Sequence, residues 1–206
     1  TTTAVTYTPR ALNITNFRST PGGTNLIANN TIFSSQSYYS SNYYYKPHGI
    51  YFSGTTNGQN VVVVNNYIYV THTQNTSSSY NGAAIESSSS MSNALVANNY
   101  WYSYGGFSQN FTGSSLVDNG TSSVSWSYSS TTGIITSSAA VNQGLDQIEY
   151  RDIDNTRNDI GTSGGPHAWS NYNTTTGKAA VFNLELPFQL YIGGNHNIKA
   201  KGFHKN

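Results

Sequence analysis

The sequence predicts an all-β protein built as a right-handed parallel β-helix, with inserted loops and a C-terminal β-strand extension. Three observations carry this prediction: a short aliphatic–asparagine repeat, insertions at equivalent places in successive repeats, and a polar composition with enough aromatic residues for a core. Each coil of such a solenoid touches only its neighbours, so repeats of unequal length are tolerated. An antiparallel sandwich with asparagine in its turns is the competing interpretation, and matching offsets in the repeats favour the β-helix.

The composition excludes a disordered chain. Only 8% of the 206 residues are charged and the formal net charge is +1, while aromatic residues make up 14%. Disordered chains carry net charge and avoid aromatic residues. A chain of this length can bury one well-formed core.

Charged residues gather towards the C-terminal end of the sequence. Five of them lie in residues 1–145 and the other twelve in residues 146–206. We therefore expect a β-helix with a closing motif over residues 1–165 and a strand extension over residues 166–206, packed on the helix or on a neighbouring chain. No basic stripe is present to follow a phosphate backbone, so nucleic acid is not an expected partner.

The expected compartment is extracellular or the cell surface. The chain contains no cysteine, and no apolar run reaches the ~20 residues needed to span a bilayer, so neither a disulfide nor a membrane span is expected. It begins at Thr1 without a methionine, which indicates a processed protein or a fragment of a longer one. A neutral surface rich in hydroxyl and amide groups is typical of extracellular bacterial proteins.

The repeat consists of two aliphatic residues, a spacer and an asparagine. Its four copies are Leu26–Asn30, Val62–Asn66, Leu95–Asn99 and Leu116–Gly120. The asparagines of successive copies are 36, 33 and 21 residues apart, and the shortest spacing resembles a bare coil of roughly 20–25 residues. The longer spacings are explained by loops inserted at one corner of the coil.

The asparagine has a direct physical role in such a coil. The chain must turn sharply between strands, and asparagine tolerates the left-handed backbone conformation that these turns require. Amides at one position of successive coils can also form a hydrogen-bonded ladder. We therefore predict that Asn29, Asn65, Asn98 and Asn119 stack in one column parallel to the helix axis.

The end of this region carries a family resemblance. The run Ser138–Gly144, followed by Asp152–Gly161, resembles the closing motif of secreted bacterial right-handed parallel β-helix repeat proteins of the pectate-lyase-like superfamily. Together with the repeats, the resemblance covers residues 10–165 and places them in the C-terminal portion of such a protein. The sequence departs from the usual motif at Asn155, where glycine is common, and at Thr162, where alanine is common. Lyases, hydrolases and adhesins share the architecture, so the resemblance implies a fold and no single activity.

The closing motif allows two interpretations of its charged residues. Arg157 can pair with Asp152, Asp154 or Asp159 and lock the last coil, because a bidentate arginine–carboxylate pair is strong and directional. Alternatively, the three aspartates form an oxygen-rich calcium loop, although no glutamate closes it as in an EF-hand. We predict the lock, with Ca²⁺ as the alternative and no other cofactor.

No catalytic residues are predicted. An inverting glycosidase needs two carboxyl groups about 6.5–9.5 Å apart, and the repeats offer only Glu86 and Asp118, which belong to different copies. His48 and His72 flank the inserted loops without the spacing of metal ligands, so they are interpreted as ordinary loop residues.

Aromatic residues are the candidate binding surface. Tyrosine combines a flat apolar ring with a polar tip and suits wet, specific surfaces. Mutual packing of the rings, holding long loops against the helix, is the alternative role. The residues concerned are Tyr38, Tyr39, Tyr43, Tyr44, Tyr45, Trp101, Tyr102 and Tyr104.

These features lead to a functional hypothesis. We expect a non-enzymatic extracellular β-helix, a surface, matrix or fibre component that binds glycans or copies of itself as a homo-oligomer or filament. The alternative is a polysaccharide-degrading enzyme, a lyase or glycoside hydrolase, or its non-catalytic fragment. A cluster of carboxylates, or of arginine or lysine with calcium, on the flank of the helix would distinguish the two, and the sequence alone does not assemble one.

Overall fold

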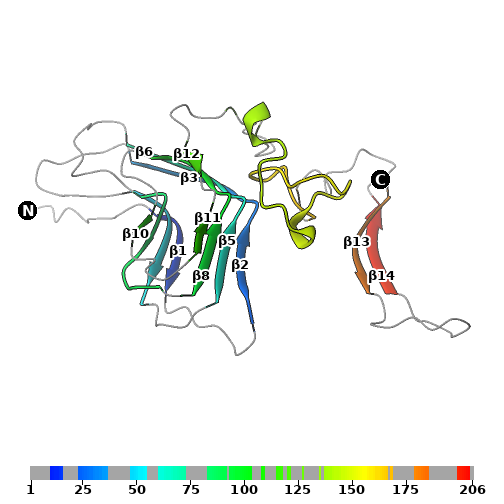
Figure 1. Cartoon of the computed structure of the whole chain (residues 1–206), viewed down its shortest axis with the longest axis horizontal. Helices are drawn as coiled ribbons and strands as arrows, with labels where there is room; N and C mark the ends of the chain where they lie inside the picture. Colours follow the sequence, from blue (N-terminus) through cyan, green and yellow to red (C-terminus); the bar gives the residue numbers. More distant parts are fainter. Residues whose placement is uncertain are drawn as a thin grey trace, which may run out of the picture.

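A computed structural model of the chain gives the fold (Figure 1). It describes residues 10–15, 23–36, 47–54, 60–72, 83–91, 93–103, 108–109, 115–117, 120–121, 127, 135, 137–166, 168, 179–185 and 199–204. The described residues form β-strands and short 3₁₀ helices, and none of them lies in an α-helix.

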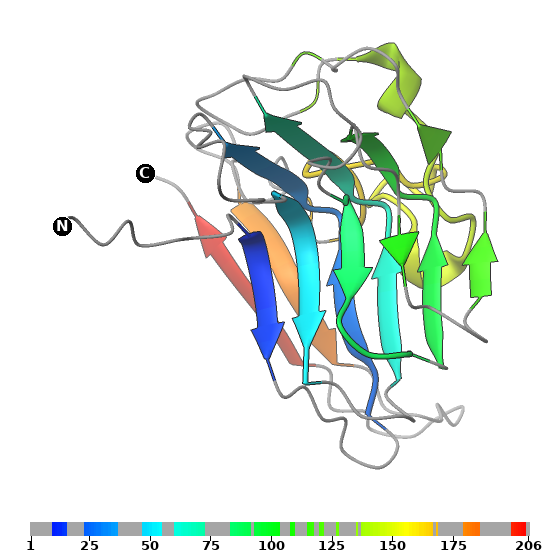
Figure 2. The same ribbon diagram turned by 90° about the vertical axis from the view of Figure 1, so that its left-hand side faces the viewer.

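The first twelve strands wind into four coils of three strands each. The strands are β1 (Arg10–Thr15), β2 (Asn25–Ala28) and β3 (Thr31–Gln36) in the first coil; β4 (His48–Ser53), β5 (Val61–Val64) and β6 (Tyr67–His72) in the second; β7 (Ile85–Ser87), β8 (Ala94–Ala97) and β9 (Tyr100–Ser103) in the third; β10 (Ser108–Gln109), β11 (Ser115–Val117) and β12 (Gly120–Thr121) in the fourth. Every third strand pairs in parallel, giving the sheets β1-β4-β7-β10, β2-β5-β8-β11 and β3-β6-β9-β12 (Figure 2). The predicted right-handed parallel β-helix is confirmed.

The asparagine of each repeat lies in the turn that follows β2, β5 or β8. Asn29, Asn65 and Asn98 follow these strands with φ angles of 55°, 57° and 49°. Ala28 lies opposite Val64, and Val64 opposite Ala97, so the three asparagines occupy equivalent positions on successive coils. The left-handed conformation that the sequence predicted for them is present in all three.

The predicted column of Asn29, Asn65 and Asn98 agrees with this register, but the hydrogen-bonded ladder is formed by the second asparagine of each pair and not by the first. Nδ2 of Asn30 donates to Oδ1 of Asn66, and Nδ2 of Asn66 donates to Oδ1 of Asn99, both over 2.9 Å. Asn66 and Asn99 are fully buried. The left-handed residue directs its own side chain away from the ladder, and the next residue supplies the inward-facing amide.

The fourth copy of the repeat has a different register from the predicted one. The sequence alignment matched Leu116 with Leu95, whereas the structure pairs Ser115 with Leu95 and Leu116 with Val96. Asn119 lies outside the described residues. It follows Val117 by two positions, as the ladder residue Asn99 follows Ala97.

Aliphatic and aromatic side chains of the three sheets fill the interior of the helix. Ile50 lies beside Ile85, and Val63 beside Val96, and all four side chains are fully buried. Burying one such side chain contributes about 1.5–3 kcal/mol. Stacked coils therefore stabilise one another, because each coil covers apolar side chains that its neighbour alone would leave exposed.

Two further strands follow the helix in the sequence. β13 (Ala179–Glu185) and β14 (Lys199–His204) pair as an antiparallel hairpin, which confirms that this region forms β-strands. Among the described strands, each contacts only the other. The division of the chain at residue 165 stays a prediction.

Candidate functional site

The closing segment, defined as residues 137–166, lies along the flank of the helix. It contains two 3₁₀ helices, η2 (Ser138–Ala140) and η3 (Ile148–Tyr150). Its apolar contacts are Ala140 and Ile160, which pack with Ile135 against the fully buried ring of Tyr67. Tyr100 of the third coil packs on the same cluster, so the segment lies across the second and third coils. The sequence analysis expected the closing motif to lock the last coil, whereas this segment packs on earlier coils of the helix.

The first asparagine of each repeat holds this segment. Asn29 Nδ2 donates to Asn158 Oδ1 over 2.7 Å, and Asn65 Oδ1 accepts from the backbone N–H of Leu145 over 2.6 Å. Asn98 Nδ2 donates to the carbonyl of Gln143 over 3.1 Å. The column formed by the first asparagines is therefore a docking strip for the closing segment.

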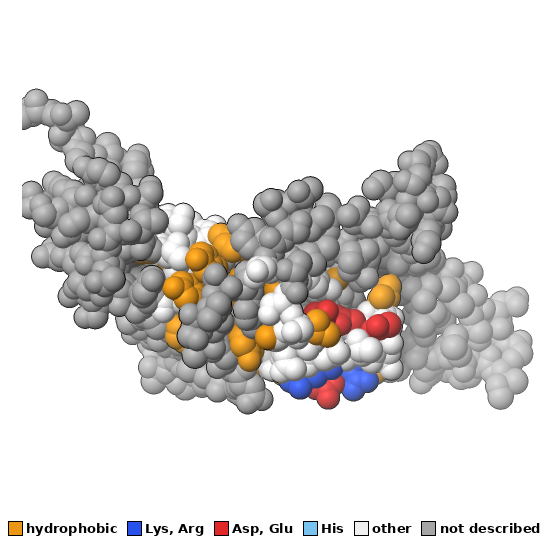
Figure 3. Space-filling model, turned by 90° about the horizontal axis from the view of Figure 1, so that it is seen from above, with side chains coloured by type: hydrophobic (Ala, Val, Ile, Leu, Met, Phe, Trp, Pro, Cys, Tyr) orange, Lys and Arg blue, Asp and Glu red, His pale blue; other side chains and the backbone are white. Residues whose placement is uncertain are grey.

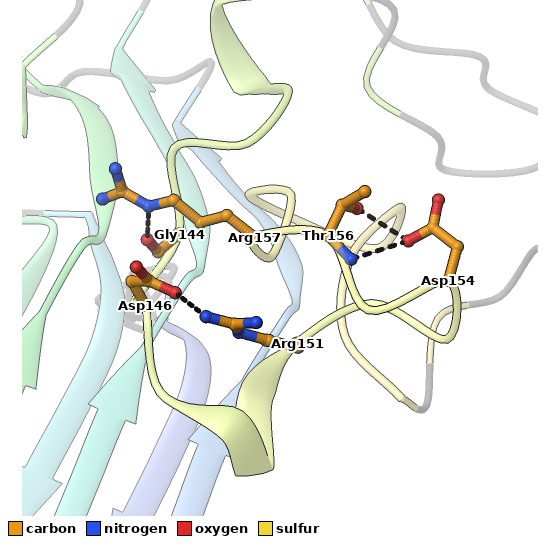
Figure 4. A network of polar contacts seen from close by, with 6 residues as sticks. All are labelled: Gly144, Asp146, Arg151, Asp154, Thr156 and Arg157. Atoms are coloured by element: carbon orange, nitrogen blue, oxygen red, sulfur yellow. Dashed lines mark hydrogen bonds and ion pairs between the residues drawn. The ribbon is translucent and has the colours of Figure 1, made fainter.

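The predicted pairing of Arg157 with an aspartate is wrong. Arg157 Nε donates to the carbonyl of Gly144 over 2.6 Å (Figure 4). The ion pair found in this segment instead joins Arg151 Nη2 to Asp146 Oδ1 over 3.0 Å, and both side chains are at least one-third exposed. Such an exposed pair contributes about 0–1 kcal/mol. Arg157 therefore links two stretches of backbone that are 13 residues apart in the chain.

The three aspartates each cap a different stretch of backbone. Asp152 Oδ1 accepts from the N–H of Gly165. Asp154 Oδ1 accepts from both the N–H and the hydroxyl of Thr156 (Figure 4). Asp159 Oδ1 accepts from the N–H of Asn142 over 2.7 Å. Within the described ranges no three histidine, aspartate or glutamate side chains are grouped to hold a metal ion. Asp152, Asp154 and Asp159 therefore do not come together as the calcium loop that was the alternative interpretation.

Local contacts shift the pKa values of two of these carboxyls in opposite directions. Burial raises the pKa of Asp152, and the nearby carboxylates of Asp159 and Asp154 raise it further, against the hydrogen bond from Gly165. Hydrogen bonds from Thr156 lower the pKa of Asp154.

Asn155, where the family motif commonly has glycine, has a φ of 67°. Both asparagine and glycine tolerate this left-handed conformation.

The candidate aromatic surface is only partly described. Tyr38, Tyr39, Tyr43, Tyr44, Tyr45 and Tyr104 lie outside the described residues. Trp101 is partly buried and packs against the core of the helix, and its place on a binding surface stays a prediction.

Tyr102 belongs to an aromatic column on the sheet β3-β6-β9-β12. Its ring stacks on Tyr69 with centroids 5.0 Å apart and an interplanar angle of 15°, and Phe33 lies 5.8 Å from Tyr69 on the other side. Figure 3, which looks down on the side where β3, β6 and β12 lie in Figure 1, shows hydrophobic side chains gathered there. Because Tyr69 and Tyr102 cover each other's faces, this column matches the packing role.

The sheet β1-β4-β7-β10 carries a polar cluster that the sequence analysis missed. His48 Nε2 lies 2.7 Å from Glu86 Oε2, and their side chains are 6% and 21% exposed. An ionised carboxylate only accepts hydrogen bonds, so Nε2 is the donor. His48 Nδ1 is buried and has no hydrogen-bond partner in the described part of the chain. A buried polar atom without a partner costs free energy, and such atoms are often explained by function.

Arg10 and Tyr51 complete the cluster. Cζ of Arg10 lies 3.7 Å from the centroid of the Tyr51 ring, a cation–π contact. The Tyr51 ring lies 4.9 Å from the His48 ring, and Tyr51 is the register partner of Glu86. We call these four residues the polar cluster. Two of the five charged residues that precede residue 146 thus meet on one face.

The interpretation of His48 as an ordinary loop residue is wrong, since it begins β4 and is buried. Its partner Glu86 is 38 residues away on the next coil, and the insertion between them hides the register from the sequence. One signal in the sequence could have pointed to Glu86: it is one of only two carboxylates before residue 146. His72 is in β6, and its side chain lies outside what is described, as does Asp118.

Comparison of the chain with protein-family models, with curated proteins and with solved structures gives no match. The helices among the described residues are too short to cross a membrane.

Proposed function

We propose that this protein is an extracellular glycan-binding β-helix, a non-enzymatic component of a surface, matrix or fibre, and that the polar cluster is its recognition site. The single observation that carries the proposal is the meeting of Arg10, Tyr51, His48 and Glu86 on one face of an otherwise nearly uncharged body. The resemblance of the closing segment supports membership of the pectate-lyase-like β-helix superfamily.

The chemistry of the cluster suits sugar hydroxyls. A guanidinium offers up to five donors in a fixed plane, and a carboxylate offers acceptors beside it. Stacking on Tyr51 restricts Arg10 before a ligand arrives, so less side-chain entropy is lost on binding. Thr15 and Ser53 add neighbouring hydroxyls on the same strands, with oxygens 3.1 Å apart.

Binding without catalysis is the better-supported form of the proposal. Hydrolysis with inversion needs a second carboxyl about 6.5–9.5 Å from the first. On the described part of this face Glu86 is the single carboxylate, and His48 already engages it. The enzyme alternative, a polysaccharide lyase or hydrolase, is one outcome of the test.

The test is binding of the intact protein to a panel of immobilised neutral and carboxylated polysaccharides. Arg10→Ala and Glu86→Gln are expected to weaken binding about tenfold or more, because one charge-assisted hydrogen bond contributes about 1.5–3 kcal/mol. Arg151→Ala, which removes an exposed arginine from the closing segment, is the matched control and should bind like the wild type.

Two outcomes would overturn the proposal. Equal binding by the wild type and Arg10→Ala would remove the polar cluster from recognition. Release of new reducing or unsaturated ends from a polysaccharide, abolished by Glu86→Gln, would establish the enzyme instead.

A further inference from the structure

The first coil ends in three strand edges. β1, β2 and β3 each lie at the border of their sheet, and no described strand pairs with their outer sides. They contain six, four and six residues. Long edge strands present rows of N–H and C=O groups that attract another strand.

The asparagine ladder is also incomplete at this end. Oδ1 of Asn66 accepts from the N–H and Nδ2 of Asn30, and Oδ1 of Asn99 accepts in the same way from Asn66. Oδ1 of Asn30 is the equivalent acceptor of the first rung, and no described residue donates to it. An asparagine in a preceding parallel coil is the group that would fill this position.

The inward-facing aliphatic side chains of the first coil are also incompletely covered. Leu12, Ile14 and Ile27 are only partly buried. Their register partners Ile50, Phe52 and Val63 have no exposed surface. Ile50, Phe52 and Val63 are buried because the second coil has a neighbour on each side. One more coil stacked on the first coil would bury Leu12, Ile14 and Ile27 in the same way.

We propose that the first coil binds the last coil of a second copy of this chain, head to tail and in parallel register. The last strands β10, β11 and β12 lie at the opposite borders of the same three sheets. The border of the last coil is therefore the parallel edge that complements the border of the first coil. The closing segment docks on turns of the first three coils, along the flank rather than across this border.

The geometry also sets the strength of the contact. The last coil contributes two, three and two residues, fewer than the first coil offers. Association is therefore weak and depends on protein concentration. A heterologous contact of this kind does not close on itself, so it builds filaments. This proposal does not rest on the proposed glycan binding, although Arg10 of the polar cluster lies on β1, one of the three strands at this border.

One backbone N–H at each end allows a selective block. Asn25 and Asn29 donate towards the second coil, and successive N–H groups along a strand alternate in direction, so the N–H of Leu26 points to the open edge. Tyr100 donates towards the second coil from the first position of β9, and Gly120 is its register partner, so the N–H of Thr121 points to the other open edge. Proline removes either N–H, and edge strands tolerate proline.

The experiment is sedimentation velocity of the full chain over a range of concentrations. The wild type should form species larger than a dimer, and Leu26→Pro and Thr121→Pro should each raise the apparent dissociation constant at least tenfold. An equimolar mixture of the two variants should give a heterodimer and nothing larger, because each supplies the edge that the other retains. Leu26→Ala and Thr121→Ala keep the N–H and should assemble like the wild type.

A monomeric wild type at the highest concentration would overturn the proposal. So would assembly of Leu26→Pro, shown to be folded by circular dichroism, with the affinity of Leu26→Ala. If one proline variant fails to fold, the other still decides the outcome, since either block alone must prevent filaments.

Discussion

Asn65 and Asn66 are adjacent in the chain and bond in different directions. Oδ1 of Asn65 accepts from the N–H of Leu145 in the closing segment, whereas Oδ1 of Asn66 accepts from the N–H and Nδ2 of Asn30 in the ladder. The left-handed φ of 57° at Asn65 separates the two directions. The asparagine pair of each repeat therefore serves both the stacking of coils and the docking of the closing segment.

Replacing Asn66 by leucine should destabilise the whole helix. Nδ2 of Asn66 donates to the carbonyls of Ile27 and Val64, and leaving a buried polar group unpaired costs about 1–3 kcal/mol each. We expect Asn66→Leu to lower the free energy of unfolding by about 3 kcal/mol or more in urea titrations. Asn30→Leu, at the exposed first rung, is the matched control and should cost less. Equal losses would contradict a ladder with a buried centre.

The pH dependence of stability should change when Asp152 loses its charge. A folded-state pKa above the unfolded value means that folding favours protonated Asp152, so this contribution is present at low pH and is lost as pH rises through the folded pKa. Asp152→Asn retains an acceptor for the N–H of Gly165 and removes the charge. We expect it to raise the free energy of unfolding at neutral pH by less than about 1 kcal/mol, because solvent screens this carboxyl.

Thermal unfolding of the wild type and Asp152→Asn between about pH 3 and pH 7 measures this difference, which should vanish at the acid end. Asp154→Asn is the control of opposite sign. The pKa of Asp154 is lowered in the folded state, so the ionised carboxylate stabilises the folded protein at pH values above its unfolded-state pKa. Removing this carboxylate should slightly lower the free energy of unfolding at neutral pH. A loss of stability in Asp152→Asn at neutral pH would count against the assignment.

His48 and Glu86 should be energetically coupled. Their contact of 2.7 Å is mostly shielded from solvent, and hydrogen bonds to charged groups contribute about 1.5–3 kcal/mol. We expect the double-mutant cycle of His48→Gln and Glu86→Gln to give a coupling free energy of about 1–2 kcal/mol in unfolding experiments. The same cycle on Arg151 and Asp146, an exposed pair, should give about 0–1 kcal/mol. No difference between the two cycles would show that the His48–Glu86 contact is not formed in solution.

The architecture was predictable because its signal is local. Two aliphatic residues, a spacer and an asparagine identify a strand and the turn that follows it, wherever the copy lies in the chain. Which asparagine forms the ladder was not predictable from offsets, since Asn29 and Asn30 repeat with the same period. Their roles are separated only by the backbone conformation of the first.

The polar cluster was not predictable because its members come from three coils. Arg10, His48 and Glu86 belong to β1, β4 and β7, and the inserted loops between these strands conceal the register. Parallel pairing then places Arg10 opposite His48 and Tyr51 opposite Glu86. For Arg157 the composition suggested a carboxylate partner, whereas the local path of the chain brings the carbonyl of Gly144 within reach.

Hydrogen–deuterium exchange of two asparagine variants tests the central claim, the separate roles of the pair, most directly. Asn65→Gly keeps the left-handed turn available and removes only the docking amide, so exchange should rise in residues 137–166 while β5 and β8 stay protected. Asn66→Ala should raise exchange in β2, β5 and β8 together. If Asn65→Gly instead exposes the coils and leaves residues 137–166 protected, the division of roles between Asn65 and Asn66 is wrong.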